Sequence, residues 1–407
     1  MHGMLRWSAV AALLACMAAV QTAAAQTASA RCRNTGSFER WLETFRQEAL
    51  GKGISRRALS AAAPLMVYEQ RIVNIDRGQR FFQQNFLSFL DRLVSKNRLQ
   101  QGAARIRKHA AAFQRVEKQY GVPAPVITAF WGLESDFGSN MGKDMTLKSL
   151  TTLAYDCRRS DMFRTHLIGA LQIIDRGDLG PEDMIGSWAG EIGQTQFMPA
   201  EYMAHAIDYD GDGKRNLLRS VSDVLGSTGK YLQHLGWRRG EPWLQEVEVP
   251  ASLPWHEADL TIQHPRAQWV RWGVKGAHGA RLPADGMQAS LILPMGRFGP
   301  AFLAYPNFKA YIGWNESLTY SLTAAYYATR LAGAPPMLRG RRDIPSLKAE
   351  QISELQRLLA QRGYKVGEID GKIGAATRAA VRAAQMRLKL PADSYPTDEL
   401  LDRLRGQ

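Results

Sequence analysis

Helical spacing of apolar residues from Ser37 to about Leu235 constrains the fold more than any other feature of this sequence. The stretch from Ser37 to Tyr120 is rich in Arg, Gln, Leu and Ala and contains few turn signals, which predicts several helices. Gly121-Val122-Pro123 interrupts the pattern, and a further helix is expected from about Pro123 to Phe137. The chain is therefore predicted to be mainly α-helical.

The pattern changes between Gly236 and Gly299, where Trp, Pro, Gly and alternating apolar residues predict short strands or loops. Helical spacing returns from Trp314 to Leu331. Residues 333–345 lack apolar periodicity and are predicted to be a linker. Residues 346–405 have an apolar pattern of their own, which indicates a small second domain of three helices. A length of 407 residues suits two or three domains.

Residues 1–25 have the organisation of an export signal. Arg6 precedes an apolar stretch from Trp7 to about Val20, and Ala23-Ala24-Ala25 provides small residues for cleavage. The stretch is too short and too rich in Ala for a typical spanning helix. A buried N-terminal helix and a lipidated Cys16 are the alternatives. Export predicts a periplasmic protein.

Removal of the signal would leave Cys32 and Cys157 of the 3 cysteines. An even pair in an exported chain predicts one disulfide, which would tie the N-terminal segment to the next domain. Two unrelated buried thiols are the alternative.

The formal net charge of +14 favours a polyanionic partner, such as nucleic acid, an anionic membrane surface or an anionic polysaccharide. Export argues against nucleic acid. The sequence also contains no basic run with interleaved aromatic residues that resembles a nucleic-acid module. The polysaccharide or the membrane surface is therefore the expected partner.

Glu134 interrupts an apolar stripe. On the predicted helix it shares one face with Ile127, Phe130 and Trp131. Loss of hydration there favours the protonated carboxyl group, which is what a general acid requires. A structural role, such as capping or pairing with a buried Arg, is the alternative. Asp136 would lie about 200° further round the helix, so it is not expected in the same pocket.

The segment from Gly186 to Pro199 combines Gly, aromatic and polar residues. Glycines let a backbone approach a ligand closely, aromatic faces stack on sugar rings, and Ser, Gln and Thr can bond to hydroxyls and acetamides. The segment is therefore a candidate sugar-binding loop. A tight connection between helices is the alternative.

These segments resemble the lytic murein transglycosylases of the membrane-bound B type, in order, from about Ser37 to Leu331. The motifs that carry the resemblance are Gly132-Leu-Glu-Ser-Asp-Phe-Gly138, Met141-Gly142, Leu153-Ala-Tyr-Asp156, Gly186-Ser-Trp-Ala-Gly190, Gln194-Thr-Gln-Phe-Met-Pro199 and Trp314-Asn-Glu-Ser-Leu-Thr-Tyr320. The resemblance implies a lysozyme-like catalytic domain over residues 33–332. It also implies cleavage of the β-1,4 bond between N-acetylmuramic acid and N-acetylglucosamine, with the muramyl C6 hydroxyl closing a 1,6-anhydro ring.

The same resemblance makes Glu134 the sole catalytic carboxylate and requires no cofactor for catalysis. The implied substrate-binding residues are Ser187, Gln196, Phe197, Tyr231, Trp314, Asn315 and Tyr320. Two residues depart from the family pattern. Trp314 stands where Tyr is usual, and Glu191 stands where a small residue is common. Two alternatives stay open: a hydrolytic muramidase in which Glu191 activates water, and a non-catalytic wall-binding scaffold.

An acidic loop begins at Asp208 and has the spacing of oxygen ligands for a structural Ca²⁺. Arg219 stands at position 12 in place of Glu, which excludes an ordinary EF-hand, and the resemblance suggests that a later acid completes the site. The expected ligands are Asp208, Asp210, Asp212, Lys214 through its carbonyl, and Asp223. A metal-free turn is the alternative.

The C-terminal domain resembles the small helical peptidoglycan-binding domain through Asp370-Gly371, Gly374 and Thr377. Its implied role is anchoring to the wall, which raises the local substrate concentration. A generic three-helix module that binds a protein is the alternative. Peptidoglycan strands are thus the predicted partner, and proteins of cell-wall synthesis or division are further candidates that the sequence does not identify.

Overall fold

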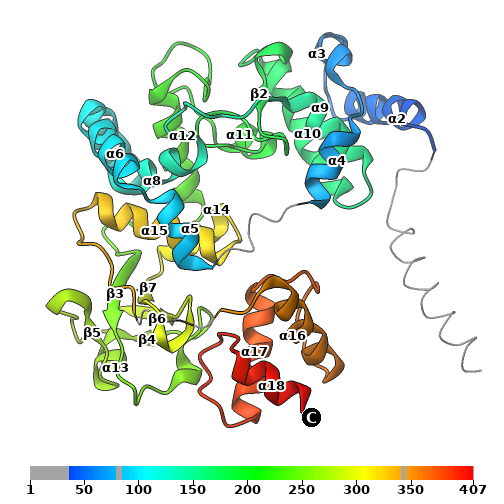
Figure 1. Cartoon of the computed structure of the whole chain (residues 1–407). Helices are drawn as coiled ribbons and strands as arrows, with labels where there is room; N and C mark the ends of the chain where they lie inside the picture. Colours follow the sequence, from blue (N-terminus) through cyan, green and yellow to red (C-terminus); the bar gives the residue numbers. More distant parts are fainter. Residues whose placement is uncertain (1–35, 79–84, 341–343, 345, 407) are drawn as a thin grey trace, which may run out of the picture. The chain divides into compact units, whose positions relative to one another are not determined.

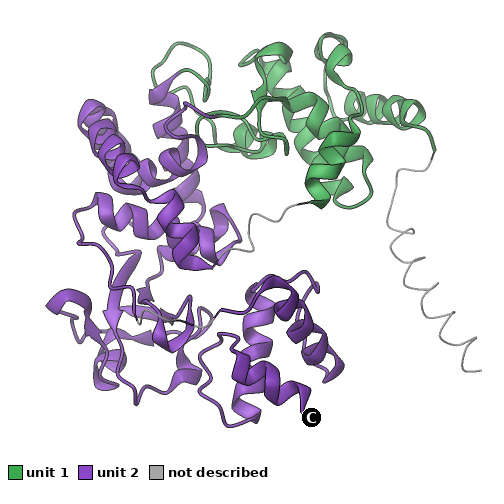
Figure 2. Cartoon of the chain, in the orientation of Figure 1, with its two compact units in different colours: residues 1–78, 141–219 green, residues 79–140, 220–407 purple. Residues whose placement is uncertain are grey.

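The computed structural model describes residues 36–78, 85–340, 344 and 346–406 (Figure 1). The predicted export signal, Cys16 and Cys32 lie outside these residues. The chain divides into two compact units, each built from two segments: unit 1 contains Met1–Gly78 and Met141–Arg219, and unit 2 contains Gln79–Asn140 and Ser220–Gln407 (Figure 2). Helices dominate both units, and the predicted mainly α fold class is confirmed. Within the described residues, no helix is long and apolar enough to span a bilayer.

Unit 1 is helical, with one short antiparallel strand pair in which Asp144 pairs with Gly186. Its helices are α2 (Phe38–Gly51), α3 (Arg56–Ala62), η1 (Ala63–Leu65), α4 (Gln70–Arg77), α9 (Thr146–Tyr155), α10 (Ser160–Arg176), η3 (Pro181–Asp183) and α11 (Pro199–His205), and its strands are β1 (Asp144–Met145) and β2 (Ile185–Gly186).

Polar contacts join the two segments of unit 1. Ser55 caps α3 and donates its hydroxyl to Asp175 Oδ1 on α10 at 2.6 Å. Asp76, near the end of α4, is buried and accepts hydrogen bonds from Arg158, at 2.8 Å, and from Arg159. A buried carboxylate needs such partners, because leaving it unpaired is strongly destabilising. The early helices of the chain therefore depend on residues from the second segment.

The helices of unit 2 that precede the C-terminal region form its helical part. They are α5 (Phe86–Leu93), α6 (Lys96–Lys108), α7 (Ala110–Tyr120), α8 (Ala124–Ser135), α12 (Val221–His234), α14 (Phe308–Trp314) and α15 (Leu318–Leu331). Helix α8 packs against α15. The approach is close at Gly132, where a Cβ atom would lie 3.0 Å from the ring of Tyr327. The Tyr327 hydroxyl also donates to the carbonyl of Arg98 on α6, at 2.7 Å.

A five-stranded antiparallel sheet follows α12 in unit 2. Its strands run in the order β4-β6-β7-β3-β5, and Val247 pairs with Ala301. Trp269 is fully buried beside the sheet and donates its indole N–H to the carbonyl of Ala289 at 3.0 Å. The elements of this region are β3 (Leu244–Glu248), η4 (Trp255–Glu257), β4 (His264–Pro265), α13 (Arg266–Arg271), β5 (Lys275–Gly276), η5 (Ala277–Gly279), β6 (Gln288–Ile292), η6 (Gly296–Phe298) and β7 (Ala301–Ala304). The expected short strands are confirmed.

The C-terminal region contains the three predicted helices, α16 (Ala349–Gln361), α17 (Ala375–Arg387) and α18 (Asp398–Arg405). Gln356 is fully buried in α16, where its oxygen accepts from the Gly371 N–H at 2.9 Å and its amide group donates to Thr377 Oγ1 at 3.1 Å. The Thr377 hydroxyl donates to the carbonyl of Val366, also at 3.1 Å. The residues that carry the C-terminal resemblance thus hold the loop between α16 and α17 in place.

Buried polar contacts connect this C-terminal region to the sheet region of the same unit. Arg378 on α17 is nearly buried and donates to the carbonyl of Leu293, just after β6, at 2.8 Å. The Asp393 carboxylate accepts from the backbone N–H of Arg297 at 3.0 Å. These polar groups are shielded from water. Breaking either hydrogen bond while the group stays shielded would therefore cost free energy.

Candidate active site

Helix α8 carries Glu134 one residue before its end. The helix begins after Pro123 and ends at Ser135, because Asp136 and Phe137 take left-handed backbone angles with φ of 48° and 60°. The expected helix is therefore confirmed, but it stops two residues early. Most of α8 is buried, while Glu134 itself is half-buried. A carboxyl group on an otherwise apolar helix is thus held at its C-terminal end.

Asp136, the other acid of this segment, is engaged elsewhere. Its Oδ1 atom accepts from Arg98 Nε at 2.7 Å, and Arg98 belongs to α6. Arg98 is itself well covered, with 16% of its side chain exposed, so the pair fixes the end of α8 to α6. The expectation that Asp136 does not share the pocket of Glu134 agrees with this contact.

Two aromatic donors converge on one oxygen of Glu134. The indole N–H of Trp314 donates to Glu134 Oε1 at 2.9 Å, and the hydroxyl of Tyr320 donates to the same oxygen. Trp314 ends α14, and Tyr320 lies in the first turn of α15. The two predicted binding residues therefore contact the predicted catalytic residue directly.

A short turn between α14 and α15 sets this convergence. Asn315 follows Trp314 in an extended conformation, and its Oδ1 accepts from the Ser317 N–H at 2.9 Å. Ser317 then caps α15, with its hydroxyl oxygen accepting from the Tyr320 N–H at 3.3 Å. Asn315, predicted to bind substrate, thus also shapes the turn that presents Trp314 and Tyr320.

The indole of Trp314 is packed against other rings. Its centroid lies 4.3 Å from that of Phe130 on α8 and 5.3 Å from that of Tyr231 on α12. Tyr231, a further predicted binding residue, therefore belongs to the same group as Glu134. The donor role of Trp314 was missed from the sequence. The only signal for it was the replacement of the usual Tyr at that position.

The remaining predicted binding residues form a second group, in unit 1. Gln196 has a left-handed φ of 49°, and its amide group donates to the carbonyl of Gly193 at 2.8 Å and to that of Met141 at 3.2 Å. Phe197 is buried, and its backbone forms a bridge with Ile192. Gln196 and Phe197 are thus fixed within the loop that follows β2.

Ser187 and Glu191 bond to each other within this loop. The Ser187 hydroxyl donates to Glu191 Oε2 at 2.8 Å, and its oxygen accepts from the Ala189 N–H at 3.1 Å. Burial raises the pKa of Glu191, while the Ser187 hydrogen bond and the charge of Arg159 oppose this shift. Burial therefore shifts Glu191 toward its neutral form relative to an exposed carboxyl group.

The glycines of this loop allow close approach of protein atoms, where the sequence suggested approach of a ligand. A Cβ atom on Gly186 would lie 1.8 Å from the carbonyl oxygen of Glu191. One on Gly190 would lie 2.5 Å from Leu150, and one on Gly193 would lie 2.7 Å from the Leu217 carbonyl oxygen. The glycine pattern of the segment is therefore required by packing.

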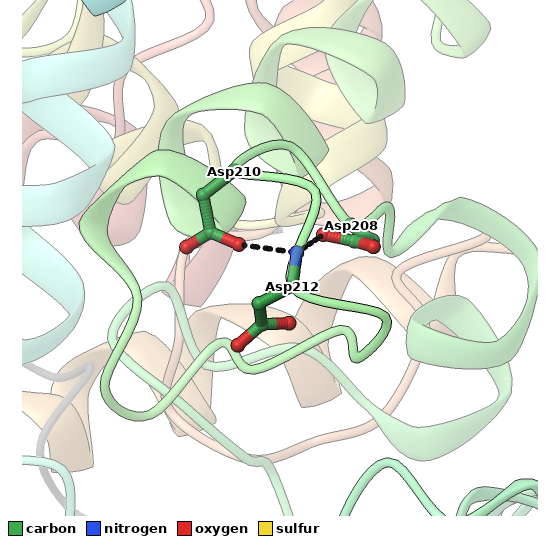
Figure 3. Close-up of side chains that lie close together, drawn as sticks. All are labelled: Asp208, Asp210 and Asp212. Carbon is green, nitrogen blue, oxygen red and sulfur yellow. Dashed lines mark hydrogen bonds between the residues drawn. The ribbon is translucent and has the colours of Figure 1, made fainter.

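The acidic loop brings together three of its five predicted ligands. One carboxylate oxygen from each of Asp208, Asp210 and Asp212 lies within 4.8 Å of the others (Figure 3). Desolvation raises the pKa of Asp208, but hydrogen bonds from the backbone N–H groups of Gly213 and Gly211 outweigh it and hold the pKa below its usual value. Three carboxyl groups placed in this way fit a hard cation such as Ca²⁺.

The two other predicted ligands are placed differently. The backbone N–H of Lys214 donates to Asp212 Oδ1 at 2.8 Å, so Lys214 is part of the same loop. Asp223 lies in the first turn of α12, in unit 2, where it is fully buried and its N–H donates to Ser220 Oγ at 3.2 Å.

Comparison with known proteins matches both regions of the chain. Residues 37–329 match the family described as Transglycosylase SLT domain, and residues 348–404 match the family described as Putative peptidoglycan binding domain. Membrane-bound lytic murein transglycosylase B of Escherichia coli (strain K12) is 29% identical over 241 residues, which is 58% of this chain. The match spans 64% of that relative's length.

The solved structures that resemble this one include SltB3 and Slt35. SltB3 from Pseudomonas aeruginosa, in complex with NAG-anhNAM-pentapeptide, aligns with a TM-score of 0.84 and 43% identity over 91% of this chain and 99% of that chain. The Escherichia coli lytic transglycosylase Slt35, in complex with calcium, aligns with a TM-score of 0.61 and 26% identity over 71% of this chain and 92% of that chain.

Proposed function

Because the chain belongs to the family of transglycosylase SLT domains, we propose that it is a lytic transglycosylase of peptidoglycan. The bond cleaved is the β-1,4 bond between N-acetylmuramic acid and N-acetylglucosamine, and the product end is 1,6-anhydromuramic acid. The observation that carries the proposal is the half-buried Glu134, which holds two aromatic hydrogen-bond donors on one carboxyl oxygen. The SltB3 complex with NAG-anhNAM-pentapeptide, at 43% identity, supports the same reaction.

One carboxyl group can perform both steps of this reaction. Protonated Glu134 donates its proton to the glycosidic oxygen as oxocarbenium-like charge develops on the muramyl ring. The resulting carboxylate then takes the proton of the C6 hydroxyl while that oxygen attacks C1. The nucleophile is already part of the substrate, so no second carboxylate is needed to activate water.

The product distinguishes this reaction from hydrolysis. Muropeptides released from purified sacculi should end in 1,6-anhydromuramic acid, each lighter by one water than the hydrolytic product and resistant to borohydride reduction. Mass spectrometry before and after borohydride treatment measures both properties. Reducible ends as the main product would overturn the proposal. A shift of Glu191→Ala from reducible to anhydro ends would then identify Glu191 as the residue that activates water.

The C-terminal helices are proposed to bind the wall. Residues 348–404 match the peptidoglycan-binding family, and within the proposed domain, residues 346–405, the buried Gln356 supports the loop that carries the family pattern. Residues 33–332 are the proposed catalytic region and 333–345 the linker. Glycan strands are the proposed partner of both regions.

The proposal places the protein in the periplasm, where its substrate lies. Export through residues 1–25, or retention at a membrane through a lipidated Cys16, would deliver it there, and the relative from Escherichia coli is described as membrane-bound. A disulfide between Cys32 and Cys157 belongs to the same proposal, because the periplasm is oxidising.

The acidic loop is proposed to bind a structural Ca²⁺ through Asp208, Asp210 and Asp212, with Lys214 of the same loop as a further ligand. Millimolar Ca²⁺ should raise the melting temperature, because an ion that binds only the folded state contributes about 2.7 kcal/mol at a concentration of about 100 times its Kd. Slt35 in complex with calcium supports this assignment. Differential scanning fluorimetry with Ca²⁺, Mg²⁺ or a chelator measures the shift.

The matched variants are Asp208→Asn, which should lose the Ca²⁺ shift, and Asp402→Asn, at an exposed position of α18, which should keep it. The absence of a shift in the unaltered protein would favour a metal-free turn.

A further inference from the structure

We propose that Trp314 is a positioning residue that keeps the transferable proton of Glu134 on Oε2, through the hydrogen bond from its indole N–H to Oε1. This inference rests on the proposed function, since it concerns the acid that cleaves the glycan. It assigns to Trp314 a role different from substrate binding, which the family resemblance implied.

The first step of the argument is the chemistry of the two donors. Oε1 of Glu134 accepts from Trp314 and from Tyr320. A phenol hydroxyl can rotate and accept a hydrogen bond, whereas an indole N–H only donates. If the proton of Glu134 were on Oε1, Tyr320 could adapt to it, but Trp314 would direct its N–H at an O–H group. Of the two contacts, the one from Trp314 therefore decides which oxygen carries the proton.

The second step is the rigidity of the indole. Phe130 and Tyr231 already contact its ring, with centroids 4.3 Å and 5.3 Å away. The turn after it is fixed by the bond between Asn315 and Ser317. A donor held in this way is oriented before the reaction starts and needs no rearrangement during it. The half-buried ring is thus held in place for its contact with Glu134.

The third step links this position to the rate. When Oε2 releases its proton to the glycosidic oxygen, negative charge spreads to Oε1, where both donors are in place. Hydrogen bonds to charged groups are stronger than those to neutral ones, so the N–H of Trp314 stabilises the transition state more than the resting acid. Nearby Asp136 contributes little competing charge, because it is paired with Arg98.

Trp314→Phe tests the inference, because it keeps an aromatic ring and removes the N–H. With a soluble peptidoglycan oligomer as substrate, we expect kcat to fall about 10- to 100-fold while KM stays within about twofold. Because the lost donor favours the carboxylate over the acid, the alkaline limb of the kcat profile should move to higher pH. Trp314→Tyr should restore only part of the rate and of the pH profile, because a hydroxyl can donate to the same oxygen but, unlike an indole N–H, can also rotate and accept from it.

Trp243→Phe is the matched control. The half-buried Trp243 donates its indole N–H to the Ala325 carbonyl oxygen at 3.0 Å, so the variant loses a similar bond away from Glu134. Its pH profile should match that of the unaltered protein, and thermal melting of each variant checks its folding.

The outcomes separate this inference from the proposed function. An unchanged kcat and pH profile in folded Trp314→Phe, or an effect on KM alone, would overturn the inference. The proposed function would still stand in that case, provided that Glu134→Gln is inactive. An active Glu134→Gln would instead overturn the role of Glu134 in the proposed function.

Discussion

Replacing Glu134 by Gln is expected to lower the rate of glycan cleavage by about 10²- to 10⁴-fold, which is the usual contribution of general acid and base catalysis. The amide has nearly the same shape and can still accept from Trp314 and Tyr320, but it cannot give a proton to the glycosidic oxygen. Release of soluble muropeptides from purified sacculi measures the rate. The folding and the binding of the variant to sacculi should be nearly unchanged.

Glu191→Gln is the informative comparison, because Glu191 is the other carboxyl group that the sequence suggested could act. It should retain cleavage and anhydro products, since the Glu191 carboxyl group is already held by the hydroxyl of Ser187 within its own loop. A Glu134→Gln variant with more than about a hundredth of the original rate would contradict the general-acid assignment.

Replacing Gly142 by Ala is expected to cost about 3 kcal/mol or more in the free energy of unfolding of unit 1. Gly142 has a φ of 102°, and a Cβ atom there would lie 1.9 Å from the carbonyl oxygen of Gly186. Backbone atoms cannot yield as a flexible side chain would, so the pairing of β1 with β2 must open. Urea unfolding followed by circular dichroism, and amide exchange in α9, measure the loss.

Gly177→Ala isolates the backbone contribution. Gly177 caps α10 with a similar φ of 82°, but a Cβ atom there would meet nothing within 4 Å. This variant should cost only about 1 to 2 kcal/mol, which is the ordinary penalty of a left-handed conformation. Equal losses in the two variants would show that the contact with Gly186 is not the cause.

Local patterns were enough to predict the helices and the position of Glu134. The stripe of Ile127, Phe130 and Trp131 placed Glu134 on a buried helix, and all three apolar residues are buried. The predicted end of α8 was two residues too late, because Asp136 and Phe137 adopt left-handed backbone angles, which are expected mainly for Gly. The bond between Asp136 and Arg98 accompanies this conformation, and no local pattern contains it.

Long-range contacts explain what the sequence did not predict. Trp314 and Glu134 are 180 positions apart, so their hydrogen bond depends on how α8, α14 and α15 pack. The glycines around Ser187 were interpreted as ligand contacts, although Gly186 and Gly190 make room for Glu191 and Leu150. The glycines indicated that other atoms approach the backbone closely, but only the tertiary structure shows that these atoms belong to the protein.

The interleaving of the two units has a consequence for the order in which the chain can fold. Ser55 and its partner Asp175 are 120 positions apart, with the first segment of unit 2 made between them. During synthesis, α3 and α4 are made before α9 and α10, against which they pack. They therefore gain these tertiary contacts only after the second segment of unit 1 has been synthesised. Contacts of such long range slow folding more than they reduce stability. A substitution that delays this assembly would thus lower the yield of protein that survives proteolysis while leaving the activity of each folded molecule intact.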